Sequence, residues 1–90
     1  MEWRLFADLA DVAGEREVTI TLDDGATVDD ALDALVASRP ALRERVLDGS
    51  TVADHVSVLV NGTDVATGDG LDEPVADGDE LALLPPVSGG

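Results

Sequence analysis

Residues 79–90 read DELALLPPVSGG and contain the segment that decides the fold. Glu80–Leu84 has the length of a strand, and the four residues after Glu80 are apolar, as in a buried strand. Pro85 ends this run, because proline has no backbone N–H to donate to a neighbouring strand. The sequence therefore predicts a last strand at residues 80–84, followed at once by a tail that cannot extend the sheet.

Two earlier segments, Trp3–Ala7 and Glu17–Leu22, alternate apolar residues at a period of two. This period is typical of strands with one buried face. We expect the two strands to pair antiparallel. The short acidic segment between them, closed by Gly14, is interpreted as a connection.

A helix is predicted after Thr27, which fits the N-cap position with Asp30 three residues later. Apolar residues then follow the i, i+3, i+4, i+7, i+8 spacing of one helical face, namely Val28, Ala31, Leu32, Leu35 and Val36. Pro40 stops this helix. Ala41–Leu47 is predicted to form a further short helical turn.

His55–Val60 is predicted to be a strand with its three valines on the buried side. Asn61-Gly62 is the strongest short hairpin signal, because both turn residues must tolerate positive φ. Asp64–Ala66 is expected to be the return strand, and Asp77-Gly78 a further turn.

This order of elements predicts an α+β protein of the β-grasp, ubiquitin-like class, in which a mixed sheet curls over one main helix. We expect one domain at residues 1–85 and a flexible tail at residues 86–90 that ends in Gly-Gly. The 90 residues are 44% hydrophobic, which suffices for a single core but not for a second catalytic lobe.

Twenty acidic residues against five basic ones give a formal charge of −15. Such a charge repels nucleic acids and anionic membranes, so neither is expected as a partner. A cytoplasmic location is expected, because the chain has no membrane-span pattern and no signal-peptide pattern. Acidic residues without any lysine suit a cytosol of molar salt, where carboxylate repulsion is screened.

The sequence contains few of the residues that catalysis or metal binding requires. His55 is the only histidine and there is no cysteine, so a catalytic triad or a multi-histidine metal site lacks members. His55 is interpreted as a strand-edge residue. The acidic clusters do not match the spacing of a calcium loop, and we interpret them as solvated surface.

Phe6, Leu59 and Leu84 fall on the strand faces opposite the predicted core. In a β-grasp sheet the three strands that carry them are neighbours, so these side chains are expected to cluster on the exposed face. An exposed apolar patch usually marks a partner surface. The alternatives are three scattered surface residues or a second small core.

Val87–Gly90 has almost no side-chain bulk after Val87, so it can thread through a narrow channel in extended form. Its one reactive group is the Gly90 carboxylate. Attack of this carboxylate on the α-phosphate of ATP gives an acyl adenylate that sulfur or amine nucleophiles can open. The alternative for a Gly-Gly end taken alone is a frayed terminus or a cloning remnant.

Four stretches together resemble the small archaeal modifier proteins and the related small subunit of molybdopterin synthase. They are LFADLADVAG, TVDDALDALVASRPALRERVL, HVSVLVNGTDV and VADGDELALLPPVSGG. The resemblance implies that a ubiquitin-activating-type adenylating enzyme, which uses ATP and magnesium, activates Gly90 next to Gly89. It also implies that the chain itself binds no cofactor and has no catalytic or metal site. The implied partner-binding residues are Phe6, Leu59, Leu84, Pro85, Pro86 and Val87, although an aliphatic residue at 84 replaces the aromatic one of the synthase subunits.

The resemblance implies two fates for the activated carboxylate. Sulfur transfer gives a thiocarboxylate that serves molybdopterin synthesis, with the synthase large subunit as partner, or tRNA thiolation. Attack by a lysine of a target protein gives an isopeptide bond. Three hypotheses remain open at this point: a modifier and sulfur carrier that is monomeric when free, a dedicated synthase subunit without conjugation, and a plain binding module.

Overall fold

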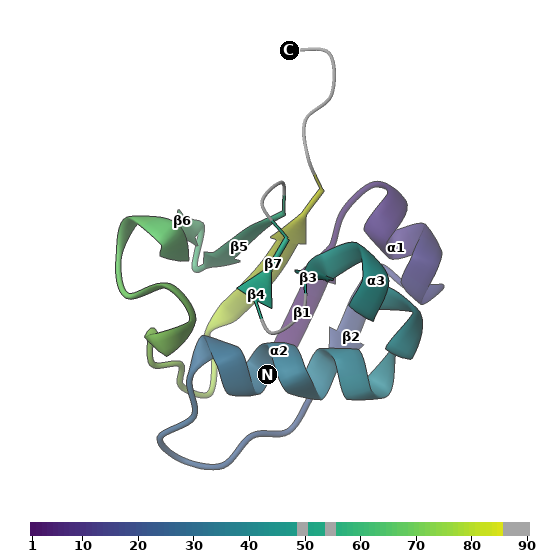
Figure 1. Cartoon of the computed structure of the whole chain (residues 1–90). Helices are drawn as coiled ribbons and strands as arrows, with labels where there is room; N and C mark the ends of the chain where they lie inside the picture. Colours follow the sequence, from purple (N-terminus) through teal and green to yellow (C-terminus); the bar gives the residue numbers. More distant parts are fainter. Residues whose placement is uncertain (49–50, 54–55, 86–90) are drawn as a thin grey trace.

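The computed structural model describes residues 1–48, 51–53 and 56–85. A five-stranded mixed sheet with the order β2-β1-β7-β5-β6 forms its centre. The strands are β1 (Glu2–Leu5), β2 (Glu17–Thr19), β5 (Ser57–Val60), β6 (Thr63–Asp64) and β7 (Glu80–Leu84). β1 and β7 pair in parallel and the other neighbours antiparallel (Figure 1). The predicted β-grasp class is confirmed, with the last strand at the predicted residues.

The register of β7 decides which side chains share a face of the sheet. Leu81 lies opposite Trp3 on one side and Val60 on the other, and Leu83 lies opposite Leu5 and Val58. We call the face that carries these residues the inner face. Because side chains alternate along a strand, the residues between them point to the other side, which we call the outer face.

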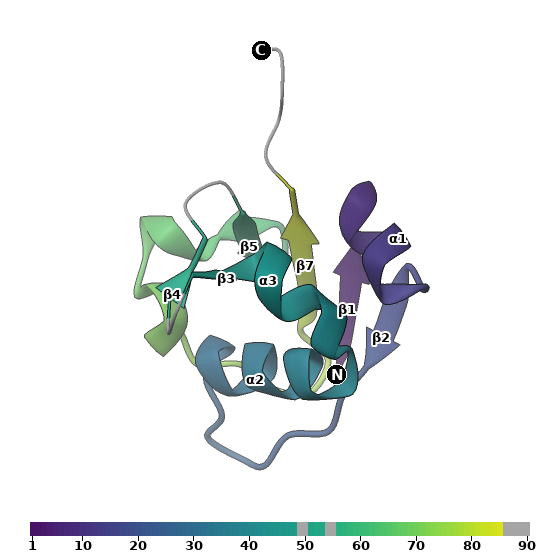
Figure 2. The ribbon, with the colours of Figure 1, turned by 45° about the vertical axis from the view of Figure 1, so that its right-hand side comes forward.

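Helix α2 (Val28–Ser38) lies over the inner face, as Figures 1 and 2 show. The predicted cap is present, because the Thr27 side chain accepts a hydrogen bond from Asp30 N and the Asp30 carboxylate accepts one from Thr27 N. The predicted apolar face is buried: Val28, Ala31, Leu32, Leu35 and Val36. Trp3 Nε1 donates to the Ala31 carbonyl at 3.0 Å, which joins the helix to the centre of the sheet.

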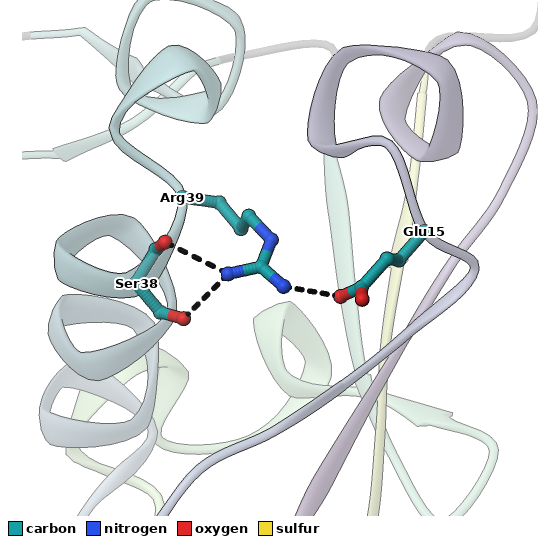
Figure 3. Close-up of polar contacts among 3 residues, drawn as sticks. All are labelled: Glu15, Ser38 and Arg39. Atoms are coloured by element: carbon teal, nitrogen blue, oxygen red, sulfur yellow. Dashed lines mark hydrogen bonds and ion pairs between the residues drawn. The ribbon is translucent and has the colours of Figure 1, made fainter.

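The predicted helical turn after Pro40 consists of a 3₁₀ helix, η1 (Pro40–Leu42), and a short helix, α3 (Arg43–Val46). Both bury their apolar residue, Leu42 and Val46, completely. At the end of α2 the Arg39 guanidinium donates to the carbonyl and hydroxyl of Ser38 and pairs with Glu15 (Figure 3). This contact fastens the helix end to the loop that precedes β2.

The prediction of a strand up to Ala7 is wrong, because β1 ends at Leu5 and a helix, α1 (Asp8–Ala13), follows. Ala7 is exposed and has φ 52°, so its side chain does not reach the core and the chain turns there into α1. The signals for α1 were Leu9, which is buried, and Gly14, whose φ of 80° closes the helix.

The two edge strands are shorter than predicted. β2 is Glu17–Thr19 and stops short of the predicted Leu22, because its pairing with β1 runs only from Arg4 to Glu2, with one further backbone contact from Ile20 N to the Met1 carbonyl. The predicted return strand 64–66 is also wrong: β6 is Thr63–Asp64, and a 3₁₀ helix, η2 (Val65–Thr67), replaces its end. The Asp64 carboxylate accepts from Ala66 N, which turns the chain out of the strand.

Smaller elements fill the remaining connections. A second sheet pairs β3 (Leu47–Asp48) with β4 (Thr51–Val52), which the sequence did not predict, and η3 (Gly70–Asp72) lies in the segment expected to be irregular. The predicted strand from residue 55 begins at Ser57, and His55 lies outside the described residues. None of the described helices is both long and apolar enough to cross a bilayer.

Candidate functional site

The outer face of the sheet carries a shallow hollow of about 320 Å³ that runs along β7. Apolar side chains from three strands or strand ends line it, together with polar groups at its rim. We call this the outer-face hollow; its lining residues are Arg4, Phe6, Leu59, Asn61, Gly62, Glu80, Ala82 and Leu84.

Strand register explains why these residues meet. Ala82 lies opposite Arg4 on β1 and opposite Leu59 on β5, so the three form one row across the sheet. Leu84 is next along β7 on the same face, and Ser57 of β5 lies opposite it. The small side chain of Ala82 makes the floor of the hollow, between larger side chains on both sides.

Phe6 is the most exposed large apolar residue among those the structure describes, with 45% of its surface accessible. It stands at the end of β1, and Leu9 N donates to its carbonyl in a tight turn at 3.2 Å. The positive φ of Ala7 lies inside this turn. Buried Leu5 and buried Leu9 hold the two sides of the turn, so the backbone of Phe6 is fixed next to the hollow.

The rim of the hollow carries one ion pair on its β1 side. Arg4 Nε lies 2.9 Å from Glu80 Oε1, and about half of each side chain is exposed. An exposed pair of this kind contributes less than about 1 kcal/mol to folding. Its larger effect here is to neutralise one carboxylate beside the apolar residues of a strongly acidic chain.

Asn61 closes the other end of the hollow by joining two turns. Its Oδ1 accepts from Glu80 N at 2.9 Å and its Nδ2 donates to Asp79 Oδ1 at 3.0 Å. The Asp79 carboxylate also accepts from Ala76 N at 2.8 Å. These contacts, the Ala76 N–H first and the Asn61 amide second, lower the pKa of Asp79 below its ordinary value.

This network has a structural role. Asn61 and Gly62 have φ of 51° and 84°, as the predicted hairpin turn requires, and Gly78 has φ 93° in the turn before β7. The Asn61 side chain therefore fixes the start of β7 against the end of β5. The hairpin and the segment before the last strand, both quoted for the resemblance, are thus in direct contact.

The structure brings together the three apolar residues that the sequence singled out, because Phe6, Leu59 and Leu84 all line the outer-face hollow. Their role in binding a partner stays a prediction. Pro85 follows Leu84 and is half-buried. Pro86, Val87, Gly89 and Gly90 lie outside the described residues, and the predicted domain boundary at residue 85 stays a prediction.

Sequence reasoning missed the contributions of Arg4, Ala82 and Asn61 to this site. Alternation along the strands placed Arg4 on the same side as Phe6, so its position at the rim was available from the sequence. The contacts of Asn61 with Asp79 and Glu80 could not be predicted from the sequence, because these residues lie 18 and 19 positions away from Asn61 in the chain.

A larger hollow of about 530 Å³ lies beside the first, between the ends of β1 and β2 and helix α1. Arg4 and Phe6 line both hollows and separate them. The larger one also includes the charged residues Asp11, Arg16 and Glu17. We place the candidate site in the smaller hollow, because it borders the last strand and its lining is mainly apolar.

The acidic residues form no candidate metal site among the described residues, where no group of three potential ligands is found. Their mutual repulsion is visible at the start of α2. The pKa of Asp29 is raised, first by partial burial and then by the neighbouring charges of Asp33, Asp30 and Asp72. This region carries surface charge whose repulsion salt can screen.

Comparisons with known proteins agree with the fold and with the resemblance. A sequence model of the ThiS family matches residues 3–90. The chain is 58% identical to small archaeal modifier protein 1 of Haloferax volcanii, over 100% of both chains. It is 38% identical to the molybdopterin synthase sulfur carrier subunit of Chlamydomonas reinhardtii, over 94% of this chain and 92% of that one.

Solved structures give the same result. The crystal structure of SAMP1 from Haloferax volcanii matches with a TM-score of 0.90 and 57% identity, over 100% of this chain and 98% of that one. A BexX/CysO complex from Amycolatopsis orientalis contains a chain that matches with a TM-score of 0.85 and 30% identity, over 99% of this chain and 98% of that one. Both the β-grasp fold and the family resemblance are therefore confirmed.

Proposed function

The chain belongs to the ThiS family, and on that basis we propose that it is a ubiquitin-like protein modifier and sulfur carrier whose Gly90 carboxylate is activated by a partner enzyme. Its relatives are named as modifier and sulfur carrier proteins. The chain is accordingly a carrier and not a catalyst. A partner enzyme is consistent with a synthase subunit and a BexX/CysO complex among the relatives.

The observation that carries this proposal is the position of β7. This strand forms the floor of the outer-face hollow and ends in it, at Leu84. The six residues from Pro85 to Gly90 reach at most about 20 Å when extended. An enzyme that covers Phe6, Leu59 and Leu84 therefore has the Gly90 carboxylate within reach of an active site close to its docking surface.

In the proposed activation, a ubiquitin-activating-type adenylating enzyme binds and uses ATP and magnesium. A Gly90 carboxylate oxygen attacks the α-phosphorus of ATP, a P–O bond breaks, and pyrophosphate leaves. The resulting acyl adenylate is an anhydride whose carbonyl carbon accepts nucleophiles. The chain contributes docking and a tail without side-chain bulk at Gly89 and Gly90, so that the tail can enter a narrow channel.

Two nucleophiles give the two proposed products. A sulfide equivalent from a sulfur donor forms a C–S bond and displaces AMP, which leaves a thiocarboxylate for molybdopterin synthesis or tRNA thiolation. A lysine ε-amine of a target protein instead forms a C–N bond, displaces AMP and loses a proton, which gives an isopeptide.

Activation is tested with the activating enzyme, ATP containing labelled phosphate, and the chain in molar potassium chloride. We expect ATP–pyrophosphate exchange with the full chain and loss of this exchange when Gly89 and Gly90 are deleted, because the reacting carboxylate then no longer reaches the active site. Replacing Ser57 by alanine, on the same face but outside the hollow, is the matched control and should leave exchange unchanged. Exchange that persists without the two glycines would refute the proposal.

The second candidate function is a dedicated small subunit of molybdopterin synthase without protein conjugation, which the 38% identity to such a subunit favours. Trypsin distinguishes the two candidates if Ser88 is replaced by arginine. The last tryptic site of the wild-type sequence is Arg45, so trypsin would leave the 45 residues that follow it attached to a target lysine. The Ser88→Arg variant leaves Gly-Gly alone. Absence of Gly-Gly-lysine peptides with an exchange-competent variant would favour the dedicated subunit.

A further inference from the structure

The chain offers no lysine to a conjugating system. All five of its basic side chains are arginines. A guanidinium stays protonated at neutral pH and does not act as an amine nucleophile. Three of the arginines form ion pairs across the fold: Arg4 with Glu80, Arg39 with Glu15, and Arg45 with Asp8. Every basic side chain of the protein is thus a guanidinium, which is not acylated at neutral pH, whereas a lysine amine can be.

The α-amine of Met1 is part of the sheet. It donates to the Ile20 carbonyl at 3.3 Å, and Ile20 N donates to the Met1 carbonyl at 2.9 Å. This exchange continues the β1–β2 ladder by one residue pair beyond Glu2 and Thr19. The Met1 side chain is half-buried against the core. One N–H of the α-amine is thus committed to Ile20, and the Met1 backbone is held in the ladder at the sheet edge, which restricts how an incoming carbonyl carbon can approach this nitrogen.

From these two observations we propose that the chain is a donor-only modifier. It joins its Gly90 carbonyl to a lysine of another protein, with formation of a C–N bond, departure of AMP and release of one proton. It does not accept a second copy, so a target carries at most one unit on each modified lysine and no chains. This inference rests on the proposed conjugating function.

The test is a conjugation reaction in an extract of Haloferax volcanii with ATP, magnesium and molar potassium chloride. The acceptor is the chain labelled with ¹⁵N and lacking Gly90, so that it cannot act as donor. The unlabelled full chain is the donor. Intact-mass spectrometry detects transfer as a gain of about 9.3 kDa on the ¹⁵N species. The matched acceptors are Arg16→Lys and Arg43→Lys, whose native side chains are exposed and make no ion pair with a described residue.

We expect no mass gain on the wild-type acceptor and a gain of one donor mass on at least one lysine variant. A donor adduct on the wild-type acceptor would overturn the inference. So would lysine variants that stay unmodified while other proteins in the extract receive the donor, because lysine would then not be the limiting group. Failure of the donor to modify any protein is a different result, which refutes the conjugating function itself.

Discussion

Replacing Phe6 by alanine tests whether the outer-face hollow is the docking surface for the activating enzyme. A phenylalanine side chain has an accessible area of about 200 Å², and Phe6 is 45% exposed. A partner can therefore cover about 90 Å² of it, which contributes about 2 kcal/mol at about 25 cal/mol per Å². We expect Phe6→Ala to weaken binding by about 30-fold.

The measurement is calorimetric titration of the activating enzyme with the chain in molar potassium chloride. Phe6 is also partly buried in the free chain, so the variant is expected to lose about 1 kcal/mol of folding free energy. Val12→Ala is the matched control, because Val12 is half-buried against the core on α1 and does not line the hollow. A dissociation constant for Phe6→Ala within threefold of the wild type would refute the docking assignment, as would equal weakening by both variants.

Three further predictions concern the stability of the fold. Arg39→Ala removes the contacts to Ser38 and Glu15 and should lower the free energy of unfolding by about 1 kcal/mol, or the melting temperature by about 5 °C. Arg39→Lys should not restore this stability, because one ammonium group cannot contact Ser38 and Glu15 as the two sides of the guanidinium do. The lowered pKa of Asp79 means that its contribution is present above its ordinary pKa of 3.8 and is lost as pH falls through the lowered value. Asp79→Asn should therefore lower the melting temperature at pH 7. Thermal melts from pH 2 to 7 should also show a smaller fall in melting temperature at acid pH for the variant than for the wild type, and an equal fall would contradict the prediction. Circular dichroism of the wild type should show a higher melting temperature in molar potassium chloride than in dilute buffer, because salt screens the net charge of −15; equal midpoints would contradict this expectation.

The sequence predicted the parts of the fold that depend on local apolar spacing and on residues that start or end a helix or strand. Thr27 and Pro40 bounded α2 correctly, because a side-chain cap and a missing donor act within a few residues. Pro85 likewise ended β7 where expected. The alternation in β5 and β7 placed Leu59 and Leu84 on the outer face, and the element order then brought them next to Phe6.

The failures lie where tertiary partners decide the outcome. The end of β1 could not be read from alternation, because Ala7 fits the pattern but reverses the chain at positive φ. β2 stops short of Leu22 because its extent is set by its pairing with β1, which ends at the pair of Glu2 and Thr19. The Asn61 network depends on two turns that meet only after the sheet has formed. These features depend on what is adjacent in space, which a single sequence does not show.

The central position of β7 has a consequence for the synthesis of the protein. Its parallel pairing with β1 joins Glu2 to Glu80, so almost the whole chain must be made before the middle of the sheet exists. Contacts of such long sequence separation form late and slowly in folding. A product of interrupted translation would lack the strand that separates β1 from β5 and would expose two unpaired edges. A chain whose sheet contains β7 has therefore been translated at least to Leu84, next to the tail in which the proposed function places the reactive carboxylate.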